Sequence, residues 1–342
     1  MNKAGRIISV TPPFAIPGGE ISIECEAFKV GGDSECACLI GGVKAHLIGA
    51  SANRVLALVP ADFDETETEI HLESGGEQSE SFAYTVGKKL ADDLHIVANP
   101  AIDPKDDSII VTRSGTRGQK LPVTLLRLET DGYLSEMPAD ILTPTAIAFN
   151  RSGNLFATNR TDGEVCRINH DEEVVPYATG LGIATGIAFD KEDVMYIGDR
   201  SGTIYRVREF GVSEPFAVLE PSVSAFHIAF GPDGKLYITA PGLASFDAVH
   251  VVDEDGYDEK YFRGFGRPQG LAFDRDGNLY IAATFQGIHG IVRIAPNAAS
   301  AEMFVAGMNV VGLCFTRKGE MIVATNDSIY SVSCGVYGTL LD

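Results

Sequence analysis

From about residue 87 onward, a unit of roughly 42 residues repeats, and this repeat limits the possible folds more than any other feature. Clear copies cover 144–168, 184–207, 226–240, 268–283 and 311–325, and a more divergent copy covers 101–115. In each copy the first apolar run ends at a large apolar residue, here called the anchor: Ile102, Phe149, Phe189, Phe230, Phe273 and Phe315. Successive anchors are 47, 40, 41, 43 and 42 residues apart. Short strands at this period are typical of a β-propeller, because a single blade cannot bury both of its faces. We predict six blades.

Turn chemistry within the copies supports four antiparallel strands per blade. The first turn often carries glycine, as in Ser152-Gly153, Asp233-Gly234, Asp276-Gly277 and Lys318-Gly319. Glycine supplies the positive φ that tight hairpins need. The repeat does not show which segment supplies the fourth strand of the last blade. Residues 336–341 or residues near 82–86 could do so.

Residues 6–86 follow a different pattern. Apolar and polar residues alternate through 7–10, 21–25, 56–59 and 69–72, and turn signals such as Gly18-Gly19 and Gly41-Gly42 separate these runs. Short alternating strands between Gly and Pro breaks predict a β-sandwich. We therefore predict an all-β chain with two domains, a sandwich at 1–86 and a six-bladed propeller at 87–342.

Both segments resemble known families. The stretches IISVTPPFAIPGGEISIECEAF, IGGVKAHLIGASANRVLALVPADF and SGGEQSESFAYTV resemble the IPT/TIG immunoglobulin-like domain. The phrases GLAFDRDGNLYIA and GIAFDKEDVMYIGD resemble NHL repeats, and also the six-bladed propellers of the gluconolactonase and senescence-marker-protein family. These resemblances imply a fold and not a chemistry, since unrelated functions share both folds.

The lactonase resemblance implies a divalent metal near the top of the central channel, held by Glu, Asn and Asp four residues before the anchors. In this chain those positions are Ala98, Thr145, Thr185, Phe226, Gln269 and Val311. None is a carboxylate, whereas a hard dication prefers several charged oxygen ligands. We therefore expect no metal and no cofactor, and favour a non-catalytic protein. A metal-dependent, gluconolactonase-like hydrolase that uses carboxylates from the loops is the alternative.

Arginines occupy one register in three consecutive copies. The residues eleven after the anchors are Arg113, Arg160, Arg200, Pro241, Thr284 and Asn326, and Arg117 and Lys120 extend the first of these loops. Guanidinium binds carboxylate or phosphate through paired hydrogen bonds. We therefore predict an anion site at the channel mouth, formed by Arg113, Arg160, Arg200, Thr145, Thr185, His227 and Gln269. Alternatively, each arginine pairs with an acid such as Asp162 or Asp199 and holds neighbouring blades together.

Other candidate groups are weaker. His227 begins the fourth inner strand and His289 lies in a predicted loop at 284–290, and a lone histidine is more often a polar neighbour than a catalytic base. Cys36 and Cys38 have no second pair at zinc spacing, while Cys166 and Cys314 lie in apolar runs. The acidic segments 62–67 and 253–256 are expected to be a solvated loop and a turn. No nucleophile elbow or phosphate-binding loop is present.

Charge and composition limit the partners. The chain has 27 Lys and Arg against 47 Asp and Glu, a formal charge of −20, which argues against nucleic acid or an anionic membrane as the main partner. No apolar run approaches the roughly 18 residues of a membrane span. The opening MNKAGRIISV lacks the apolar core of a secretory signal, so we expect a cytoplasmic protein. Bacterial proteins that resemble this domain pair are often exported, and an exported form stays open.

The sequence thus favours a binding protein whose partner is a small anionic molecule or another protein. The channel mouth suits this role because rigid blades hold variable loops in a ring. A structural or surface-assembly role through the N-terminal domain is a further alternative.

Overall fold

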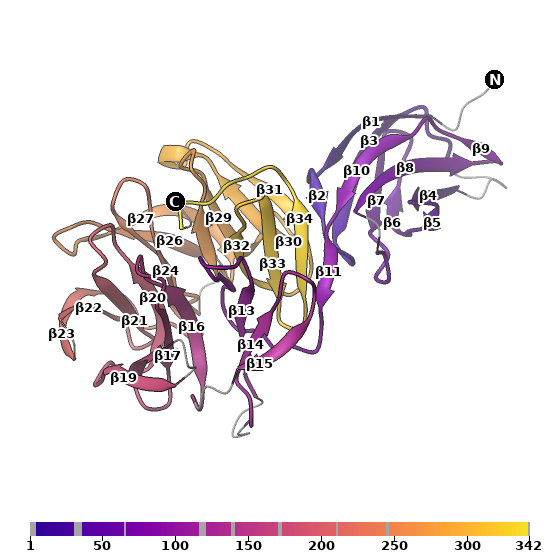
Figure 1. Cartoon of the computed structure of the whole chain (residues 1–342). Helices are drawn as coiled ribbons and strands as arrows, with labels where there is room; N and C mark the ends of the chain where they lie inside the picture. The colour runs from indigo at the N-terminus through magenta and orange to yellow at the C-terminus, as the bar shows by residue number, and fades with distance from the viewer. Residues whose placement is uncertain are drawn as a thin grey trace.

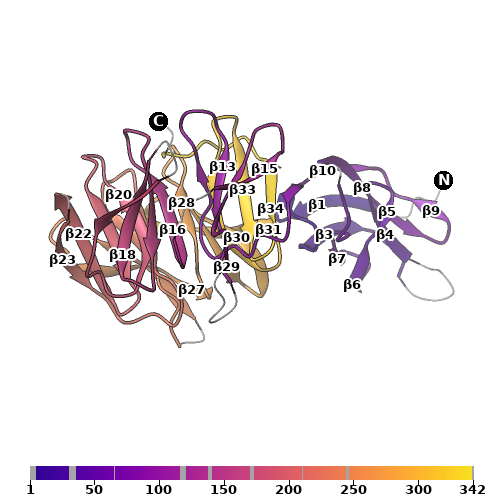
Figure 2. The same ribbon diagram turned by 60° about the horizontal axis from the view of Figure 1, so that its bottom comes forward.

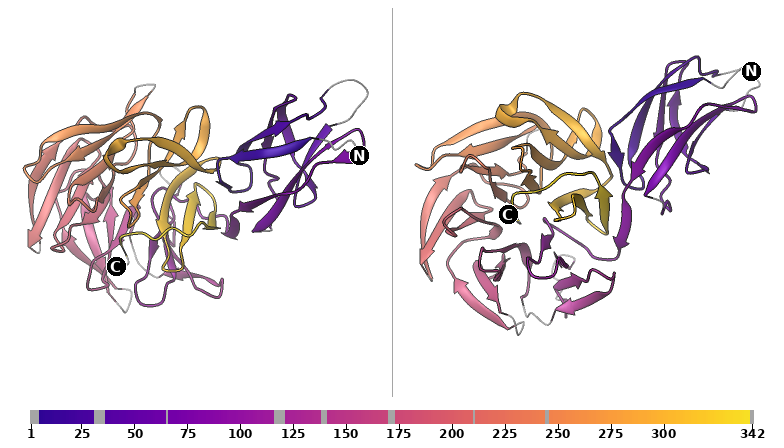
Figure 3. Two further views of the ribbon diagram at one scale, coloured as in Figure 1. Left: turned by 90° about the horizontal axis from the view of Figure 1, so that it is seen from above. Right: turned by 45° about the horizontal axis from the view of Figure 1, so that its top comes forward.

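The computed structural model describes residues 5–30, 36–64, 66–115, 121–137, 141–169, 173–209, 211–243 and 246–340. Almost all regular structure in these ranges is β-strand, and a short 3-10 turn at Pro296–Ala298 is the one helical element there. In the right-hand view of Figure 3 the later strands form a ring of blades, and a smaller N-terminal unit projects from one side of it. The same division is visible in Figure 1.

Six four-stranded blades form the ring within the described ranges. Blade 1 contains β12 (Ala101–Ile102), β13 (Ile109–Thr112), β14 (Leu125–Leu128) and β15 (Leu134–Met137); blade 2 contains β16 (Pro144–Phe149), β17 (Leu155–Asn159), β18 (Glu164–Ile168) and β19 (Val174–Ala178). Blade 3 contains β20 (Ala184–Phe189), β21 (Met195–Asp199), β22 (Thr203–Glu209) and β23 (Val212–Val218); blade 4 contains β24 (His227–Phe230), β25 (Leu236–Thr239), β26 (Asp247–Val252) and β27 (Asp258–Gly266). Blade 5 contains β28 (Leu271–Phe273), β29 (Leu279–Phe285), β30 (Ile288–Ile294) and β31 (Ala301–Ala306); blade 6 contains β32 (Val310–Phe315), β33 (Glu320–Thr325), β34 (Ile329–Ser333) and β11 (Lys88–Ala91).

An aromatic ladder joins neighbouring blades. The residue seven after an anchor packs against the anchor of the next blade, with ring centroids 4.8–5.3 Å apart. The pairs are Phe156–Phe189, Tyr196–Phe230, Tyr237–Phe273 and Tyr280–Phe315. Tilted and edge-on aromatic pairs contribute about 0.5–1.5 kcal/mol each beyond the burial of their area. The repeated anchors of the sequence therefore form the aromatic contacts that pack each blade against the next.

The first hairpin of each blade has the turn chemistry that its sequence predicts. Gly153, Gly234, Gly277 and Gly319 all have positive φ, between 75° and 83°. In blades 1 and 3 the same left-handed position is taken by Asp107 and Asp193, with φ of 63° and 65°. Aspartate tolerates this conformation because its short side chain bonds to nearby backbone.

Strand β11 closes the ring, because Lys88–Ala91 pairs antiparallel with β34 at the outer edge of blade 6. The C-terminal candidate from the sequence is wrong, and the other candidate, near residues 82–86, lies two residues before the strand that closes the ring. Residues 82–86 form β10 (Phe82–Val86), which stays in the N-terminal unit, and the closing strand starts two residues after it. The lysines of β11 are exposed, as expected for an edge strand. Because of these polar residues, the segment does not have the apolar pattern that predicts a strand.

The C-terminal segment, the other candidate for closure, lies against blades 5 and 6 instead. Gly338 forms a bridge with Asp274, and the Thr339 amide donates to the carbonyl of Phe273 in blade 5. The guanidinium of Arg275 lies 5.5 Å from the ring centre of Tyr337. In Figure 3 this segment runs from blade 6 toward the middle of the ring. It therefore lies at the end of the ring at which the inner strands finish.

Two sheets with a common core make up the N-terminal unit. One contains β1 (Arg6–Thr11), β3 (Glu20–Glu26), β7 (Arg54–Leu58) and β6 (His46–Ala50); the other contains β2 (Phe14–Ala15), β10, β8 (Glu67–Ser74), β4 (Cys36–Ile40), β5 (Val43–Lys44) and β9 (Glu77–Gln78). Buried side chains from both sheets meet in one cluster, including Ile21, Ile23, Ile70 and Leu72. The alternation read from the sequence thus gives one buried and one exposed face per sheet.

A continuous sheet connects this unit to the propeller. Strand β2 lies between β10 and β31 of blade 5 and pairs parallel with both, so the second N-terminal sheet continues into the blade. Ile16 belongs to the buried cluster of blades 5 and 6, and its amide donates to the carbonyl of Ala306. The backbone of Gly19 lies so close to blade 5 that a Cβ on this residue would be 2.5 Å from the carbonyl oxygen of Ala306. Figure 2 shows the unit beside β31 and β34.

Candidate functional site

The loops at one end of the axis are built by a hydrogen bond that recurs from blade to blade. We call this end, where the inner strands begin, the mouth. The amide of the residue eleven after the anchor donates to the carbonyl six before it: Arg160 to Thr143, Arg200 to Ile183 and Asn326 to Asn309. Blade 1 departs slightly, since the Ser114 amide donates to the carbonyl of His95. In blades 2, 3 and 6, and in a shifted form in blade 1, the exit of the second strand is therefore fixed against the start of the inner strand.

The three arginines of this register differ in their contacts. Arg200 is exposed, and its guanidinium donates to the carbonyls of Ser222 at 3.2 Å and Val223 at 2.9 Å. Arg113 is half-buried and lies 3.9 Å from a carboxylate oxygen of Asp93, which is itself 80% exposed. Arg160 is exposed, and within the described residues its side chain has no hydrogen bond or ion pair. Arg117 and Lys120 lie outside the described residues.

The acids suggested as partners for these arginines bind other groups. Asp162 accepts from the Asn159 amide group at 2.7 Å, and Asp199 accepts from the Ile183 amide and from Ser201. Elsewhere arginines do pair with carboxylates across neighbouring strands, as Arg206 does with Glu214 at 2.6 Å. Apart from the long Arg113–Asp93 contact, the arginine charges at the mouth are not neutralised by a described carboxylate.

Two of the predicted binding residues in the inner strands already have structural roles. The Thr185 hydroxyl donates to the Gly198 carbonyl at 3.3 Å and accepts from the Phe226 amide at 3.0 Å. Gln269 is half-buried, and its backbone carbonyl accepts from the hydroxyl of Thr239. These contacts tie blade 3 to blade 4 and blade 4 to blade 5.

Thr145 and His227 differ, because each keeps a buried polar atom without a partner among the described residues. The Thr145 hydroxyl and the His227 Nε2 are both in this state, and so is the Nε of Arg113. Six such side-chain atoms occur in the described chain, and these three belong to the mouth residues singled out in the sequence. A buried polar atom without a partner costs about 1–3 kcal/mol, so each is a place where a bound molecule could supply the missing hydrogen bond.

Burial controls the charge of His227. The side chain is 4% exposed, and burial lowers its pKa from 6.5 to about 4. The imidazole is therefore neutral at physiological pH. It can offer a hydrogen bond to a ligand but adds no positive charge to the mouth.

Asn99, which sequence reasoning missed, joins the inner strands of blades 5 and 6 near the mouth. Its amide group donates to the Leu271 carbonyl at 2.9 Å, and its carbonyl oxygen accepts from the Leu313 amide at 3.1 Å. A Cβ on Gly270 would lie 1.9 Å from Asn99 Oδ1, and one on Gly312 would lie 2.7 Å from Asn99 Cα. Gly270 and Gly312 both lie three residues before their anchors, and this shared register was the sequence signal for a close approach by another residue.

The lactonase-type metal does not fit the residues present. Of the six positions that the resemblance implies, Ala98, Phe226 and Val311 are apolar and buried. The hydroxyl of Thr185 is already bonded, which leaves one hydroxyl and one amide as possible ligands. Neither carries charge to balance a dication. Within the described residues, no group of three or more His, Cys, Asp and Glu side chains could hold a metal ion.

His289 is placed differently from its prediction. The segment 284–290 is not a loop, because β29 and β30 continue through it and pair Thr284 with His289. The turn consists of Gln286 and Gly287, both with positive φ, which is hairpin chemistry that the sequence reading overlooked. The imidazole Nδ1 and the Thr284 hydroxyl are 2.8 Å apart on the exposed surface. His289 is thus a partnered surface residue.

Cysteines and acidic segments take structural positions. Cys166 and Cys314 are buried, and burial raises the pKa of both thiols, that of Cys166 to about 12. Residues 253–256 form the turn between β26 and β27, as predicted. In the other acidic segment Asp62 and Asp64 are exposed around a buried Phe63.

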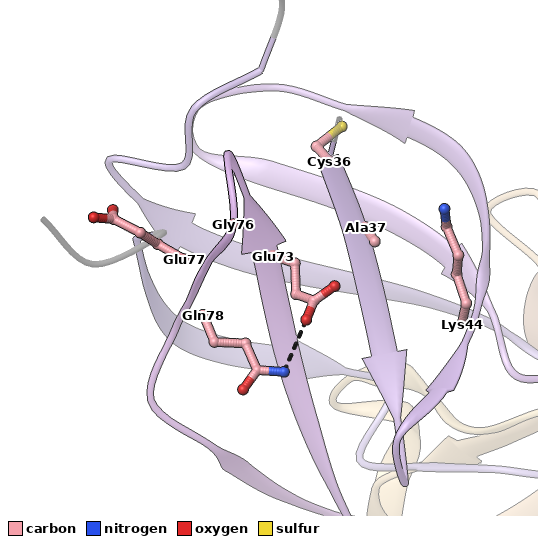
Figure 4. Close-up of a pocket in the computed structure, with 7 residues that line it drawn as sticks. All are labelled: Cys36, Ala37, Lys44, Glu73, Gly76, Glu77 and Gln78. Atoms are coloured by element: carbon pink, nitrogen blue, oxygen red, sulfur yellow. Dashed lines mark hydrogen bonds between the residues drawn. The ribbon is translucent and has the colours of Figure 1, made fainter. Parts of the chain in front are cut away.

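Two shallow hollows lie on the N-terminal unit. The larger, about 470 Å³, is lined by Cys36, Ala37, Lys44, Glu73, Gly76, Glu77 and Gln78. Figure 4 shows that these side chains come from β4, β5 and the β8–β9 hairpin, and that Gln78 donates to its cross-strand neighbour Glu73 at 3.0 Å. The smaller hollow, about 370 Å³, lies over the neighbouring part of the same sheet. Opposite charges and an internal hydrogen bond make the larger hollow a weaker candidate than the mouth.

Comparisons with known proteins show the fold. No family model and no curated protein matches the chain. Among solved structures, an auxiliary nutrient binding protein from Bacteroides ovatus aligns over 97% of this chain and 98% of its own, with 12% identity and a TM-score of 0.56. A gluconolactonase from Xanthomonas campestris aligns over 73% and 89%, with 13% identity and a TM-score of 0.59. A virginiamycin B lyase from Staphylococcus aureus aligns over 87% and 99%, with 15% identity and a TM-score of 0.54.

These similarities establish a β-propeller and, at such identities, nothing about activity. The similarity to the nutrient binding protein extends over nearly the whole chain, so it includes the N-terminal unit. In the described part of the chain, no helix is long and apolar enough to cross a membrane.

Proposed function

We propose that this chain is a non-catalytic binding protein whose propeller mouth holds the anionic group of a ligand. The observation that carries the proposal is the set of three unpartnered buried polar atoms, on Arg113, Thr145 and His227, at the end where Arg160 is exposed without a described partner. Hydrogen bonds to a charged group contribute about 1.5–3 kcal/mol each. We further propose that 1–86 is an immunoglobulin-like accessory domain of the IPT/TIG type and that 87–342 is an NHL-like propeller.

Arg160 is the residue whose loss tests this function most directly. Its guanidinium can take a carboxylate or phosphate in two parallel hydrogen bonds, while Arg200 is partly committed to two carbonyls. His227 and Thr145 would then orient the ligand through neutral hydrogen bonds.

The test is calorimetric titration of the full chain with phosphate, succinate, citrate and gluconate. We expect at least one of these anions to bind, and Arg160→Gln to weaken it about tenfold or more. Arg151→Gln is the matched control, because Arg151 is exposed on the same blade at the opposite end. The proposal fails if none of the four anions binds the wild-type chain, or if both variants bind the anion equally.

A lactonase-type hydrolase is the second candidate, favoured by the structural similarity to a gluconolactonase. It would need carboxylates from outside the six implied positions. Elemental analysis of the purified protein, together with hydrolysis of gluconolactone before and after chelation, separates the two candidates. A stoichiometric divalent metal and chelator-sensitive hydrolysis would replace the binding proposal.

A further inference from the structure

A half-ring of exposed apolar side chains surrounds part of the mouth. Leu142, Ile183 and Val223 are 39%, 43% and 45% exposed, and Leu243 and Phe246, from the β25–β26 loop, are 94% and 73% exposed. We call these five residues the apolar crown. Large apolar side chains that lie singly on a surface need no explanation, whereas a connected group marks an interaction site.

Register and hydrogen bonds place the crown residues at one end of the ring. Leu142 and Val223 lie seven residues before their anchors and Ile183 lies six before, so all three occupy the inter-blade loops of one end. The Arg200 amide donates to Ile183 at 3.0 Å, and the Arg200 side chain donates to Val223 at 2.9 Å. The Val223 amide in turn donates to Pro241 at 2.9 Å, two residues before Leu243.

Arginines alternate with the crown residues. Leu142 precedes Thr143, whose carbonyl accepts from the Arg160 amide, and Ile183 holds the amide of Arg200 in the same way. Along the edge of blades 2 to 4 the surface therefore presents an apolar side chain, a guanidinium, and an apolar side chain again. Such a surface fits a partner that carries carboxylates between apolar groups.

The size and charge of the crown select the kind of partner. Its members lie on the junctions between blades 1 and 2, 2 and 3, and 3 and 4, and on a loop of blade 4, so a small molecule reaches only a part of it. A second copy of the chain would bring a further charge of −20 against the same charge. The same −20 disfavours an anionic lipid surface or a nucleic acid, because an extended polyanion meets the charge of the whole chain, whereas a short segment with a few carboxylates meets only the edge that carries Arg160 and Arg200.

We propose that the crown docks an extended peptide segment of another protein, with acidic residues spaced between apolar ones. This inference rests on the proposed function, since the anion held at the mouth is then a carboxylate of the bound segment. The apolar side chains of the segment cover Val223, Leu243 and Phe246, while its carboxylates reach Arg160 and Arg200. The crown supplies affinity by apolar burial, and the arginines set the register of the segment.

The test uses a random dodecapeptide library displayed on phage and selected against the immobilised full chain. We expect the enriched sequences to carry Asp or Glu between Leu, Ile, Phe or Val. Each enriched peptide is then synthesised with a fluorophore and titrated by anisotropy. Leu243→Ser with Phe246→Ser should weaken its binding about tenfold or more.

Val212→Ser with Tyr257→Ser is the matched control. These two residues are 60% and 72% exposed where β22 meets β23 and β26 meets β27, at the end of the ring opposite the mouth, and the control variant should bind the peptide as the wild type does. Hydrogen exchange of the wild-type chain supplies a readout that needs no variant. The bound peptide should slow exchange in the loops 219–226 and 240–243.

Several results overturn the inference. The selection could enrich no peptides, or the crown variant could bind the peptide as tightly as the wild type does. Hydrogen exchange could slow only in other loops. Sedimentation could show that the crown joins two copies of this chain. The small anions separate this inference from the proposed function. If the crown variant binds phosphate or succinate normally but has lost the peptide, both proposals stand. If no small anion binds and Arg160→Gln leaves the peptide affinity unchanged, the anion site fails while apolar docking stands.

Discussion

The neutral, buried His227 makes a quantitative prediction about pH and stability. Burial places its folded-state pKa at about 4, against 6.5 for an unburied histidine. Because the folded-state value is the lower one, its contribution to stability is fully present above pH 6.5 and is lost as the pH falls from 6.5 toward 4. At about 1.36 kcal/mol per pH unit the total is about 3 kcal/mol, of which about 2 kcal/mol is lost by pH 5.

The assay compares the free energy of unfolding by urea near pH 7 and near pH 5 for the wild type and for His227→Gln. The variant has lost the titrating group, so acidification should cost it about 2 kcal/mol less than it costs the wild type. Taking this difference removes the contribution of the many carboxylates, which both proteins share. It also removes any packing defect that the substitution creates equally at both pH values.

A control variant, His46→Gln, replaces a histidine on the exposed edge strand β6. It should show the same pH dependence as the wild type. Parallel stability profiles for the wild type and His227→Gln would refute the reasoning, because they would mean that His227 takes up its proton without unfolding. The imidazole would then be accessible at the mouth, and its pKa would not be lowered.

Three further predictions concern other parts of the chain. The pKa of the Cys166 thiol is raised to about 12, so in the folded protein this thiol should resist a disulfide reagent at mildly alkaline pH and react fully once the chain is denatured, as thiol titration would show. Gly19→Ala should lower the free energy of unfolding by about 1–3 kcal/mol, because the added methyl meets the Ala306 carbonyl, while Gly49→Ala, with open space around it, should lower it less in the same urea titration. Deleting 335–342 should lower the melting temperature measured by calorimetry, because the segment bonds and packs against blades 5 and 6.

Local chemistry explains what the sequence predicted well. The hairpins of the blades depend on a residue with positive φ four or five positions after the anchor. A glycine at that position, such as Gly153 or Gly277, predicts the turn from the sequence alone. The anchors repeat because each must fill the same space against the next blade, as Phe189 does against Phe156. Such features depend on a few neighbouring residues and on one repeated contact.

Long-range pairing explains what the sequence could not predict. Strand β11 is short, polar and half exposed, and only its partner β34 identifies it as a strand of blade 6. Asn99 acts on Leu271 and Leu313, far along the chain, and nothing in its own neighbourhood indicates that role. The site residues were chosen by register alone, which does not show that the Thr185 hydroxyl is already bonded while that of Thr145 is not. Their part in binding stays a prediction.

The pairing of β2 with β31 and of β11 with β34 also constrains how the chain acquires its structure on the ribosome. Both early strands are translated long before the partners that complete their hydrogen bonds. Until blades 5 and 6 emerge, the free edge of β2 and the apolar side chain of Ile16 have nothing to cover them. The N-terminal strands therefore stay unpaired on one edge until the C-terminal blades have been translated. During that interval the nascent chain is most exposed to incorrect strand pairing and to chaperone binding.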